Sequence, residues 1–382
     1  MDVFITDLAS FLPNEPVGND DMEKILGMVN QIPSRTRRII LRNNKITHRY
    51  YAIDPQTGKT THNNAQLTAE AIRQLKPSKN FSTSDIQCLC CGTSSPDQLI
   101  PGHAPMVHGE MGGGICEIMS AAGVCTSGMV ALKHAFMNVA LGSTENAVAT
   151  GSELGSTFLL ARLCAPCSAE KTEELEKQPA LSFEADFLRW MLSDGAGAAF
   201  LSNQPGKDNF SLRLDWIDIL SFAHLFEPCM YAGADKNPDG SLTGWREYPS
   251  LEQAVNEHCF QIKQDVKLLN REISDTSVIR TLPLLIDKYA LNADEIDWFL
   301  PHYSSEYFRP ELQKKLTRIG FDIPKERWFT NLTYKGNTGA ASIYIMLEEL
   351  FHSGKLKKGE KLLCFVPESG RFTICYMLLT VV

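Results

Sequence analysis

Residues 84–95, Ser-Asp-Ile-Gln-Cys-Leu-Cys-Cys-Gly-Thr-Ser-Ser, align with residues 294–305, Asp-Glu-Ile-Asp-Trp-Phe-Leu-Pro-His-Tyr-Ser-Ser. Each stretch is typical of an acidic turn, then a buried strand, then a polar loop. A helical pattern precedes each strand, over residues 67–75 and 282–289, and a glycine-rich turn with a second helix follows it. This weak internal repeat predicts a chain of two similar halves.

The repeat continues from residues 147–153 to residues 362–370, each a short apolar strand that ends in a loop of small residues. Alternating strands and helices predict an α/β fold, with mixed or mostly parallel sheets covered by helices and active residues at the ends of strands. We place the boundary near residue 204, which gives halves 1–204 and 205–382. Two segments have no counterpart in the repeat and are expected to be surface insertions that form lids or channel walls, residues 165–182 and 226–250.

Composition limits the classes of function. The 382-residue chain has a net charge of −8, which argues against nucleic acid as a partner, and it contains no apolar run of the ~20 residues that cross a bilayer. The N-terminus has no signal-peptide pattern, so we expect a cytoplasmic protein. The eleven cysteines do not resemble a secreted disulfide framework. Cys164 and Cys167 form a lone CxxC without a second ligand pair, so no metal site is predicted.

Cys125 lies in a turn of small residues, 123–128, that opens the apolar stretch 129–141. A thiol at a helix N-terminus is expected to ionise more readily, and the free N–H groups there can hold an oxyanion. The alternative is a small buried cysteine without reactivity. The neighbouring features of the sequence favour the reactive interpretation.

His302 and Asn337 are those features. Cys125 follows Ile86 of the repeat by 125 − 86 = 39 positions, and Asn337 follows Ile296 by 337 − 296 = 41, so both residues are expected at matching helix starts. A thiol, an imidazole and an amide form a plausible set for acyl transfer. Asn337 is also a good helix cap, and the two roles are compatible.

With these pieces in place, the sequence resembles the thiolase-fold condensing enzymes, most closely those like ketoacyl-[acyl-carrier-protein] synthase III. The matching pieces run in the family's order: residues 93–97, 123–128, 151–153, 194–199, 301–302 and 336–338. The resemblance implies a five-layered αβαβα fold of two pseudo-repeated halves, usually a homodimer, and no cofactor. It implies Cys125 as the acyl-accepting nucleophile, and His302 and Asn337 as ligands of the second substrate's thioester carbonyl. The backbone N–H groups of Cys125 and Gly370 are expected to hold the other oxyanion.

The chain departs from the family at two loops. Residues 303–305 are Tyr-Ser-Ser where relatives usually have Gln-Ala-Asn, and residues 369–371 are Ser-Gly-Arg where relatives have Gly-Gly-Gly. Ile100 stands at a position that lines the acyl channel in relatives. Arg42 belongs to a basic cluster, with Arg35, Arg37, Arg38, Lys45 and Arg49, that is either part of the substrate entrance for an acidic carrier protein or a solvated face.

Among divergent relatives, the chain looks most like the enzymes that make dialkylresorcinols, the lipid part of flexirubin-type pigments. Such enzymes join a β-ketoacyl and an unsaturated acyl thioester, carried by acyl carrier protein or coenzyme A, into a cyclohexanedione that a separate oxidase aromatises. Two alternatives use the same three residues: a decarboxylative synthase that extends a primer with malonyl-acyl carrier protein, and a head-to-head enzyme that forms β-ketoacids. A third alternative is an inactive scaffold, which the presence of Cys125, His302 and Asn337 disfavours.

Overall fold

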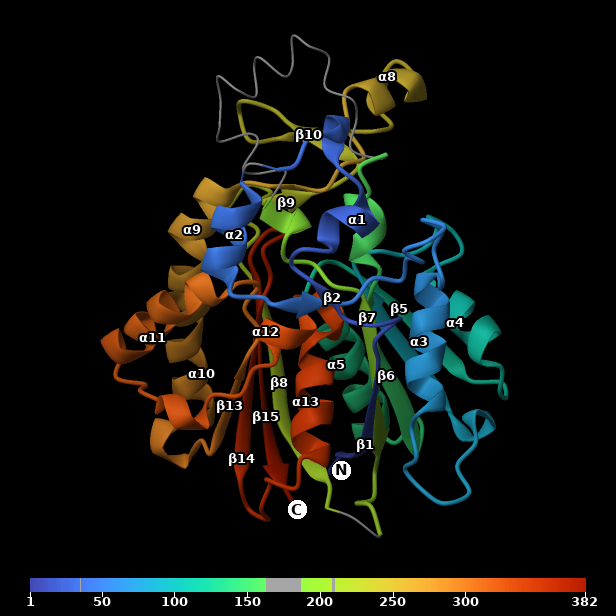
Figure 1. The fold of residues 1–382 in the computed structure, drawn as a ribbon. Helices are drawn as coiled ribbons and strands as arrows, with labels where there is room; N and C mark the ends of the chain where they lie inside the picture. Colours follow the sequence, from blue (N-terminus) through green and yellow to red (C-terminus); the bar gives the residue numbers. More distant parts are fainter. Residues whose placement is uncertain (35, 163–186, 208–209) are drawn as a thin grey trace.

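A computed structural model describes residues 1–34, 36–162, 187–207 and 210–382 (Figure 1). The predicted insertion 165–182 and the pair Cys164 and Cys167 lie outside these residues. The main body is a mixed sheet of nine described strands, with helices on both sides and between its two parts. Both termini lie at the same end of this body (Figure 1).

The strands of the sheet are, in spatial order, β5 (Glu117–Ala122), β4 (Cys88–Thr93), β6 (Asn146–Glu153), β7 (Gly195–Ser202), β1 (Phe4–Phe11), β8 (Leu212–Ser221), β15 (Thr373–Val381), β14 (Lys361–Pro367) and β13 (Trp298–Pro301). The first five strands come from the first half of the chain and the last four from the second. The halves join where β1 meets β8 through only two residue pairs.

The order of strand directions repeats in the two halves. In the first half β4 runs parallel to β6, which runs antiparallel to β7, which runs antiparallel to β1. In the second half β13 runs parallel to β14, which runs antiparallel to β15, which runs antiparallel to β8. The internal repeat seen in the sequence is therefore a repeat of topology. The predicted boundary at residue 204 falls between β7 and β8 and stays a prediction.

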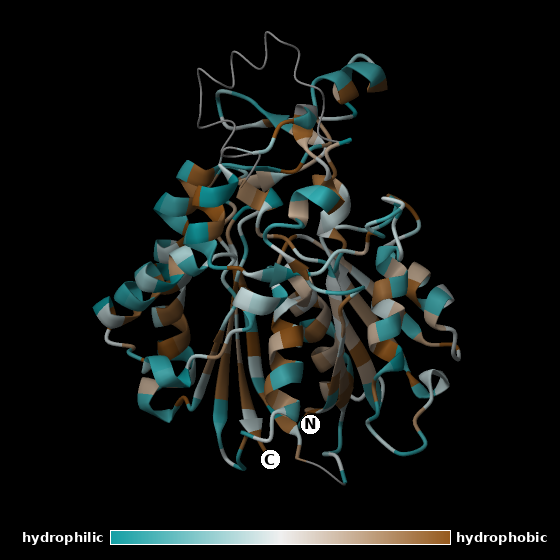
Figure 2. Cartoon of the chain, viewed as in Figure 1, coloured by the Kyte–Doolittle hydropathy of each residue, from teal (hydrophilic) through white to brown (hydrophobic). Residues whose placement is uncertain are grey.

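The helices form three layers around the two half-sheets: α3 (Asn64–Arg73) and α4 (His103–Met111) on one outer face, α5 (Ser127–Ala140) and α13 (Ser342–His352) in the centre, and α9 (Val266–Ser274), α10 (Leu282–Tyr289) and α11 (Arg309–Arg318) on the other outer face (Figure 1). The π-helical segment η4 (Asp275–Thr281) joins α9 to α10. Apolar residues concentrate in the strands and in the helices packed on them (Figure 2). The expected αβαβα architecture of the thiolase type is confirmed.

The central helix α5 shows why the two halves pack so closely. Its buried residues Gly128, Leu132, Ala135 and Val139 recur at helical spacing. A side chain at Gly128 would stand 2.4 Å from the carbonyl oxygen of Ala340, at the start of the opposite central helix. Small residues at this contact let the two helix starts approach, which brings the segments around Cys125 and Asn337 together.

The remaining elements lie mostly over the end of the sheet that is opposite the termini (Figure 1). They are α1 (Met22–Leu26), α2 (Arg37–Asn44), β2 (Val17–Gly18) paired with β3 (His48–Arg49), β9 (Met230–Tyr231) paired with β12 (Lys263–Gln264), β10 (Ala234–Lys236) paired with β11 (Leu242–Gly244), α8 (Leu251–Asn256) and α12 (Leu332–Lys335). Among the described helices, none is long and apolar enough to cross a membrane.

Candidate active site

The loops after four parallel strands converge on one site. Ser94 follows β4, Glu153 ends β6, His302 follows β13, and Ser369 follows β14. All four residues line one or both of two cavities that share Cys125 in their walls. Active residues of α/β folds collect at the carboxyl ends of parallel strands, so this is the place where the topology predicts a site.

The larger cavity has a volume of about 300 Å³. Cys125 and Asn337 stand in its wall with the polar side chains of Ser94, Ser95 and Glu153. Much of the remaining wall is apolar and comes from two regions: Phe158, Phe187, Leu188, Met191 and Leu192 on one side, and Met230, Tyr231, Ala232 and Ile262 on the other. Residues 230–232 belong to the predicted insertion 226–250, so this insertion forms a channel wall as expected.

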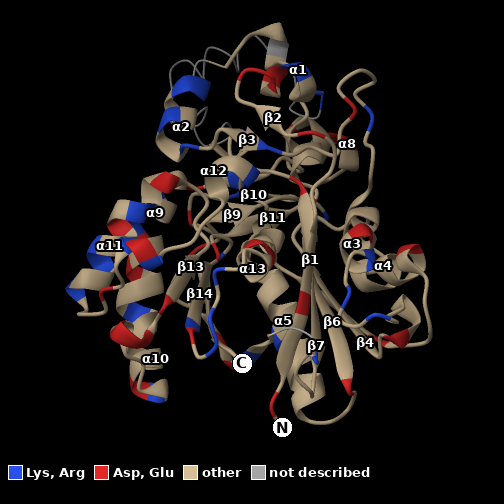
Figure 3. Ribbon diagram, turned by 60° about the horizontal axis from the view of Figure 1, so that its bottom comes forward, with Lys and Arg blue, Asp and Glu red and all other residues tan. Residues whose placement is uncertain are grey.

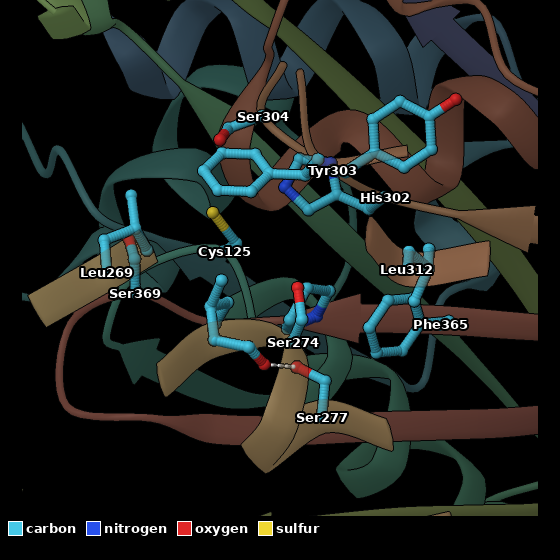
Figure 4. A pocket seen from close by; sticks show the side chains of 13 residues that line it. Cys125, Leu269, Ser274, Ser277, His302, Tyr303, Ser304, Leu312, Phe365 and Ser369 are labelled. Carbon is cyan, nitrogen blue, oxygen red and sulfur yellow. Dashed lines mark hydrogen bonds between the residues drawn. The ribbon is translucent and has the colours of Figure 1, made fainter. Parts of the chain in front are cut away.

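The smaller cavity has a volume of about 50 Å³ and contains His302 and Cys125 (Figure 4). Its other walls are mainly apolar side chains from the second half of the chain: Leu269, Ile273, Phe308, Leu312 and Phe365. Cys125, Ser304 and Ser369 line both cavities. The two cavities therefore meet at the predicted nucleophile.

Cys125 lies two residues before the first residue of α5, as predicted, and is only 9% exposed. Burial raises the pKa of its thiol, and the carboxylates of Glu153 and Glu368 raise it further. The expected ionised thiolate is therefore wrong for the protein without substrate. The helix N-terminus does not outweigh the loss of hydration and two neighbouring negative charges.

His302 directly follows β13, and its backbone N–H donates to the carbonyl oxygen of Phe365 at 2.8 Å. Burial lowers the pKa of the His302 imidazole to about 4, so the ring is neutral at physiological pH. A neutral imidazole is a weak base here but retains one N–H that can donate to a carbonyl oxygen. The expected role in binding a thioester carbonyl fits this state better than a role as proton acceptor.

Asn337 stands between α12 and the short turn η8 (Gly339–Ala341) that leads into α13. Its side-chain oxygen accepts a hydrogen bond from the backbone N–H of Gly339 at 3.0 Å. This bond lies within the turn itself, and the N-cap residues of η8 and α13 are Thr338 and Ala341, so the expected capping role of Asn337 is not seen. Donation from its amide nitrogen to a substrate stays a prediction.

Glu153 and Glu368 are the two charged neighbours that sequence reasoning did not assign. Glu153 accepts hydrogen bonds from Ser94, from Ser95 and from the backbone N–H of Ala340. Burial raises the pKa of Glu153. Glu368 accepts a hydrogen bond from the Thr126 hydroxyl at 2.7 Å. The repeat contained the signal, because aligning residue 147 with residue 362 also aligns Glu153 with Glu368.

Three other predicted positions lie outside the cavity walls. Gly370 lies beside Val124, and its carbonyl oxygen accepts hydrogen bonds from the backbone N–H groups of Cys229 and Met230. Its predicted role in holding the oxyanion stays a prediction. Ile100 is 86% exposed and lines neither cavity of this chain. Arg42 is exposed on α2, and the ribbon of α2 is blue at its Lys and Arg positions in Figure 3.

The basic cluster around Arg42 is smaller than predicted. Arg49 is fully buried and donates to the carbonyl oxygen of Trp190, so its inclusion in a surface cluster was wrong. Arg37 pairs with Glu23, and Arg35 lies outside the described residues. Burial of Arg49 follows from its place in β3, beside Gly336 of the loop before Asn337. Among the described residues, no cluster of His, Cys, Asp and Glu is arranged to hold a metal ion.

Comparison with known proteins agrees with this geometry. Residues 286–378 match the family model described as 3-oxoacyl-[acyl-carrier-protein (ACP)] synthase III C terminal. The chain is 25% identical over 371 residues to beta-ketoacyl-[acyl-carrier-protein] synthase III of Chlorobaculum tepidum, covering 95% of this chain and 94% of that protein. It is 24% identical over 367 residues to the protein of the same name from Rhizorhabdus wittichii, with the same coverages.

Solved structures show the same fold over the whole chain. AbyA1, described as a tetronic acid condensing enzyme, superposes with a TM-score of 0.75 at 20% identity, covering 99% of both chains. OleA of Xanthomonas campestris superposes with a TM-score of 0.74 at 18% identity, covering 100% of this chain and 98% of that one. The chain thus has the thiolase-type fold and is similar over nearly its whole length to ketoacyl-[acyl-carrier-protein] synthase III, and it is an acyltransferase that forms carbon–carbon bonds.

Proposed function

We propose that this enzyme joins two acyl thioesters, a β-ketoacyl and an enoyl chain, into a cyclohexanedione precursor of dialkylresorcinols. The observation that carries the proposal is the pair of largely apolar cavities that meet at Cys125. A condensation of two acyl chains needs space for both beside the nucleophile, and each cavity provides an apolar wall for one chain. Extension of a primer by malonyl needs space for one chain only.

In the first step the enoyl group moves from its carrier to Cys125. The Cys125 sulfur forms the new thioester bond, the bond to the carrier sulfur breaks, and the thiol proton leaves on the carrier thiol. The backbone N–H groups of Cys125 and Gly370 are proposed to stabilise the tetrahedral oxyanion of this step. The raised pKa of Cys125 makes the proton transfer part of the reaction, because little thiolate exists beforehand.

In the second step the carbon between the two carbonyls of the β-ketoacyl thioester adds to the β-carbon of the enoyl group, and no group is lost. The γ-carbon of the β-ketoacyl chain then attacks the Cys125 thioester carbonyl. This attack closes a six-membered ring and releases Cys125, which takes up the proton that the γ-carbon gives up. His302 and Asn337 are proposed to donate hydrogen bonds to the β-ketoacyl thioester oxygen. The ring still carries the thioester of the β-ketoacyl partner, so hydrolysis of that thioester, which releases the carrier thiol, and loss of the carboxyl group as carbon dioxide would give the dione that a separate oxidase aromatises.

Two neighbouring activities are the alternatives. The first is a decarboxylative synthase that uses malonyl-acyl carrier protein, which fits the name of the sequence relatives, beta-ketoacyl-[acyl-carrier-protein] synthase III. A head-to-head enzyme that forms β-ketoacids would also need two acyl cavities. All three reactions use the same nucleophile, so the products decide between them.

Mass spectrometry of the products tests the proposal. The purified enzyme is given a β-ketoacyl thioester and a 2-enoyl thioester together, and the cyclised dione is the expected product. A parallel reaction contains an acyl-coenzyme A primer and malonyl-acyl carrier protein. Release of carbon dioxide there, with no dione in the first reaction, would establish the decarboxylative activity instead.

We also propose that the enzyme is a homodimer formed along β5. This strand is an edge of the sheet, and it exposes Ile118. Ile115, Leu99 and Ile100 are also exposed, and the start of α4 that follows Leu99 and Ile100 is held at this edge, because the Ala104 N–H donates to the Ser120 hydroxyl of β5. An apolar strand edge is a template for pairing with a second copy, which would cover Ile100 and give it a channel position. Light scattering should show a dimer for the wild type and a monomer for Ile118→Asp.

Carrier delivery is proposed for the face near α2. Arg38, Arg42 and Lys45 are exposed there. Helix α2 packs against η6 (Glu306–Phe308), and Phe308 lines the smaller cavity. A positive face beside a cavity suits an acidic carrier protein or the phosphates of coenzyme A.

A further inference from the structure

We infer that the hydroxyl groups of Ser304 and Ser369 recognise the keto oxygen of a β-ketoacyl thioester and so select that substrate class. The inference rests on the proposed function, because it names residues that select one of its two substrates. Apart from Cys125, Ser304 and Ser369 are the residues that line both cavities. They therefore stand at the junction where the reacting carbons must lie.

Both hydroxyls are available to a ligand. Among the residues that the structure describes, none forms a hydrogen bond with the Ser304 hydroxyl. The Ser369 hydroxyl donates only to the sulfur of Met230, at 3.6 Å, and a thioether is a weak acceptor. Figure 4 shows Ser304 and Ser369 on either side of Cys125. A ligand oxygen at the junction would therefore gain hydrogen bonds without breaking strong ones.

The loop that carries Ser304 is held rigidly. The Tyr303 hydroxyl donates to Glu306 at 2.9 Å, and the Ser305 hydroxyl accepts from the backbone N–H of Tyr307. His302, two residues before Ser304, is fixed by its bond to Phe365. A donor fixed in place before the substrate binds loses little entropy on binding, which suits a residue that discriminates substrates.

Neither serine belongs to the proposed catalytic set of Cys125, His302 and Asn337, so each hydroxyl adds a donor beside that set. In a β-ketoacyl thioester the keto oxygen lies two carbons from the thioester carbonyl, so donors close to His302 can reach it. A saturated acyl chain has no oxygen there and would leave these hydroxyls unpaired, which is how polar sites reject such analogues.

Binding measurements in the Cys125→Ala protein test the inference without turnover. The probes are a β-ketoacyl pantetheine thioester and the saturated acyl thioester of equal length, titrated by calorimetry. We expect the keto compound to bind about tenfold more tightly, and Ser304→Ala to remove most of that preference while leaving the affinity for the saturated compound unchanged. Ser304→Thr, which keeps the hydroxyl, should restore the preference, and the double change of both serines to alanine should abolish it.

Equal affinities for the two probes in the parent protein, or a preference that persists in the double variant, would overturn the inference. A variant that has lost its structure is recognised by weaker binding of both probes together and by its circular dichroism spectrum. The product assay for the dione is separate. A missing dione with an intact Ser304-dependent keto preference would reject the proposed ring closure and keep the recognition of the β-ketoacyl group.

Discussion

The ends of β6 and β14 occupy equivalent places in the two halves and carry equivalent carboxylates, Glu153 and Glu368. Their contacts cross between the halves. Glu153 of the first half binds the backbone N–H of Ala340 at the start of the second half's central helix. Glu368 of the second half binds Thr126, next to Cys125 at the start of the first half's helix. Each half therefore holds the helix start of the other.

The surroundings of the two carboxylates differ. Glu153 accepts hydrogen bonds from Ser94, Ser95 and Ala340, two at each of its carboxylate oxygens. Glu368 accepts one short hydrogen bond from Thr126 and one long one, 3.4 Å, from the backbone N–H of Arg371. The two halves therefore share one framework but differ at their helix starts, one of which carries the predicted nucleophile and the other a predicted donor, Asn337. The variants below separate these contributions.

The largest effect is expected from Cys125→Ala, which removes the nucleophile of the first half. Covalent loading by an enoyl thioester should fall to nothing, while the fold persists because a small buried side chain is replaced by a smaller one. Intact-mass measurement checks the adduct, and thermal unfolding checks the fold. An acyl adduct on this variant would show that another residue is the nucleophile.

His302→Ala tests the donor side of the second half. Loading of Cys125 should survive, and condensation should fall by about 10²- to 10³-fold, the usual cost of removing one oxyanion donor. Intact mass reports loading and product analysis reports condensation. Asn337→Ala should show the same split between the two steps. Equal loss of loading and condensation in His302→Ala would instead make this residue a base that activates the thiol.

The pH dependence of the condensation rate also tests the role of His302. Because the pKa of His302 is about 4, the neutral ring persists at every pH well above that value. The condensation rate of the wild type should therefore show no fall attributable to a histidine between pH 5 and pH 8. A condensation rate that falls as the pH is lowered through 6.5 in the wild type, and does not do so in His302→Ala, would contradict the role of His302 as a neutral donor.

The predictable part of the molecule is the repeated part. Strand β13 and helix α10 lie where residues 294–305 and 282–289 predicted them, because alternating buried strands and helices leave a periodic pattern. The corresponding places of Cys125 and Asn337 in the two halves followed from their similar spacing, 39 and 41 positions after Ile86 and Ile296. Turn residues and periodicity predict local structure, and the internal repeat predicts that both halves arrange their strands and helices in the same way.

The unpredictable part depends on contacts between distant segments. Burial of Arg49 and the protonated state of Cys125 both depend on residues more than a hundred positions away. The cavity wall at Met230 comes from an insertion without any repeat partner. Ile100 is exposed in this chain, and its predicted channel position requires the second copy proposed above. Local patterns carry no information about such neighbours.

A smaller effect is expected in the insertion that walls the larger cavity. Met230→Trp should shorten this cavity and lower kcat/KM for a long acyl thioester by roughly tenfold, because a misfit in an apolar pocket costs about 1–3 kcal/mol. A short acyl thioester should react as before. Leu251→Trp, an exposed position on α8 in the same region, is the matched control. Equal loss with short and long chains would assign Met230 to the chemistry and not to chain length.

The smallest effect is expected at Glu368, and it returns to the two carboxylates. The negative charge of Glu368 raises the pKa of Cys125, so Glu368→Gln should lower that pKa and increase the thiolate fraction at any pH below it. Alkylation of Cys125 by iodoacetamide at pH 8 should become faster by roughly three- to tenfold, and its pH profile should move to lower pH. Glu368→Asp keeps the charge and serves as the control. Glu153→Gln adds a second comparison, because the carboxylate of Glu153 also raises the pKa of Cys125. If the pH profile of alkylation moves in Glu153→Gln and does not move in Glu368→Gln, then Glu153, and not Glu368, keeps the thiol protonated.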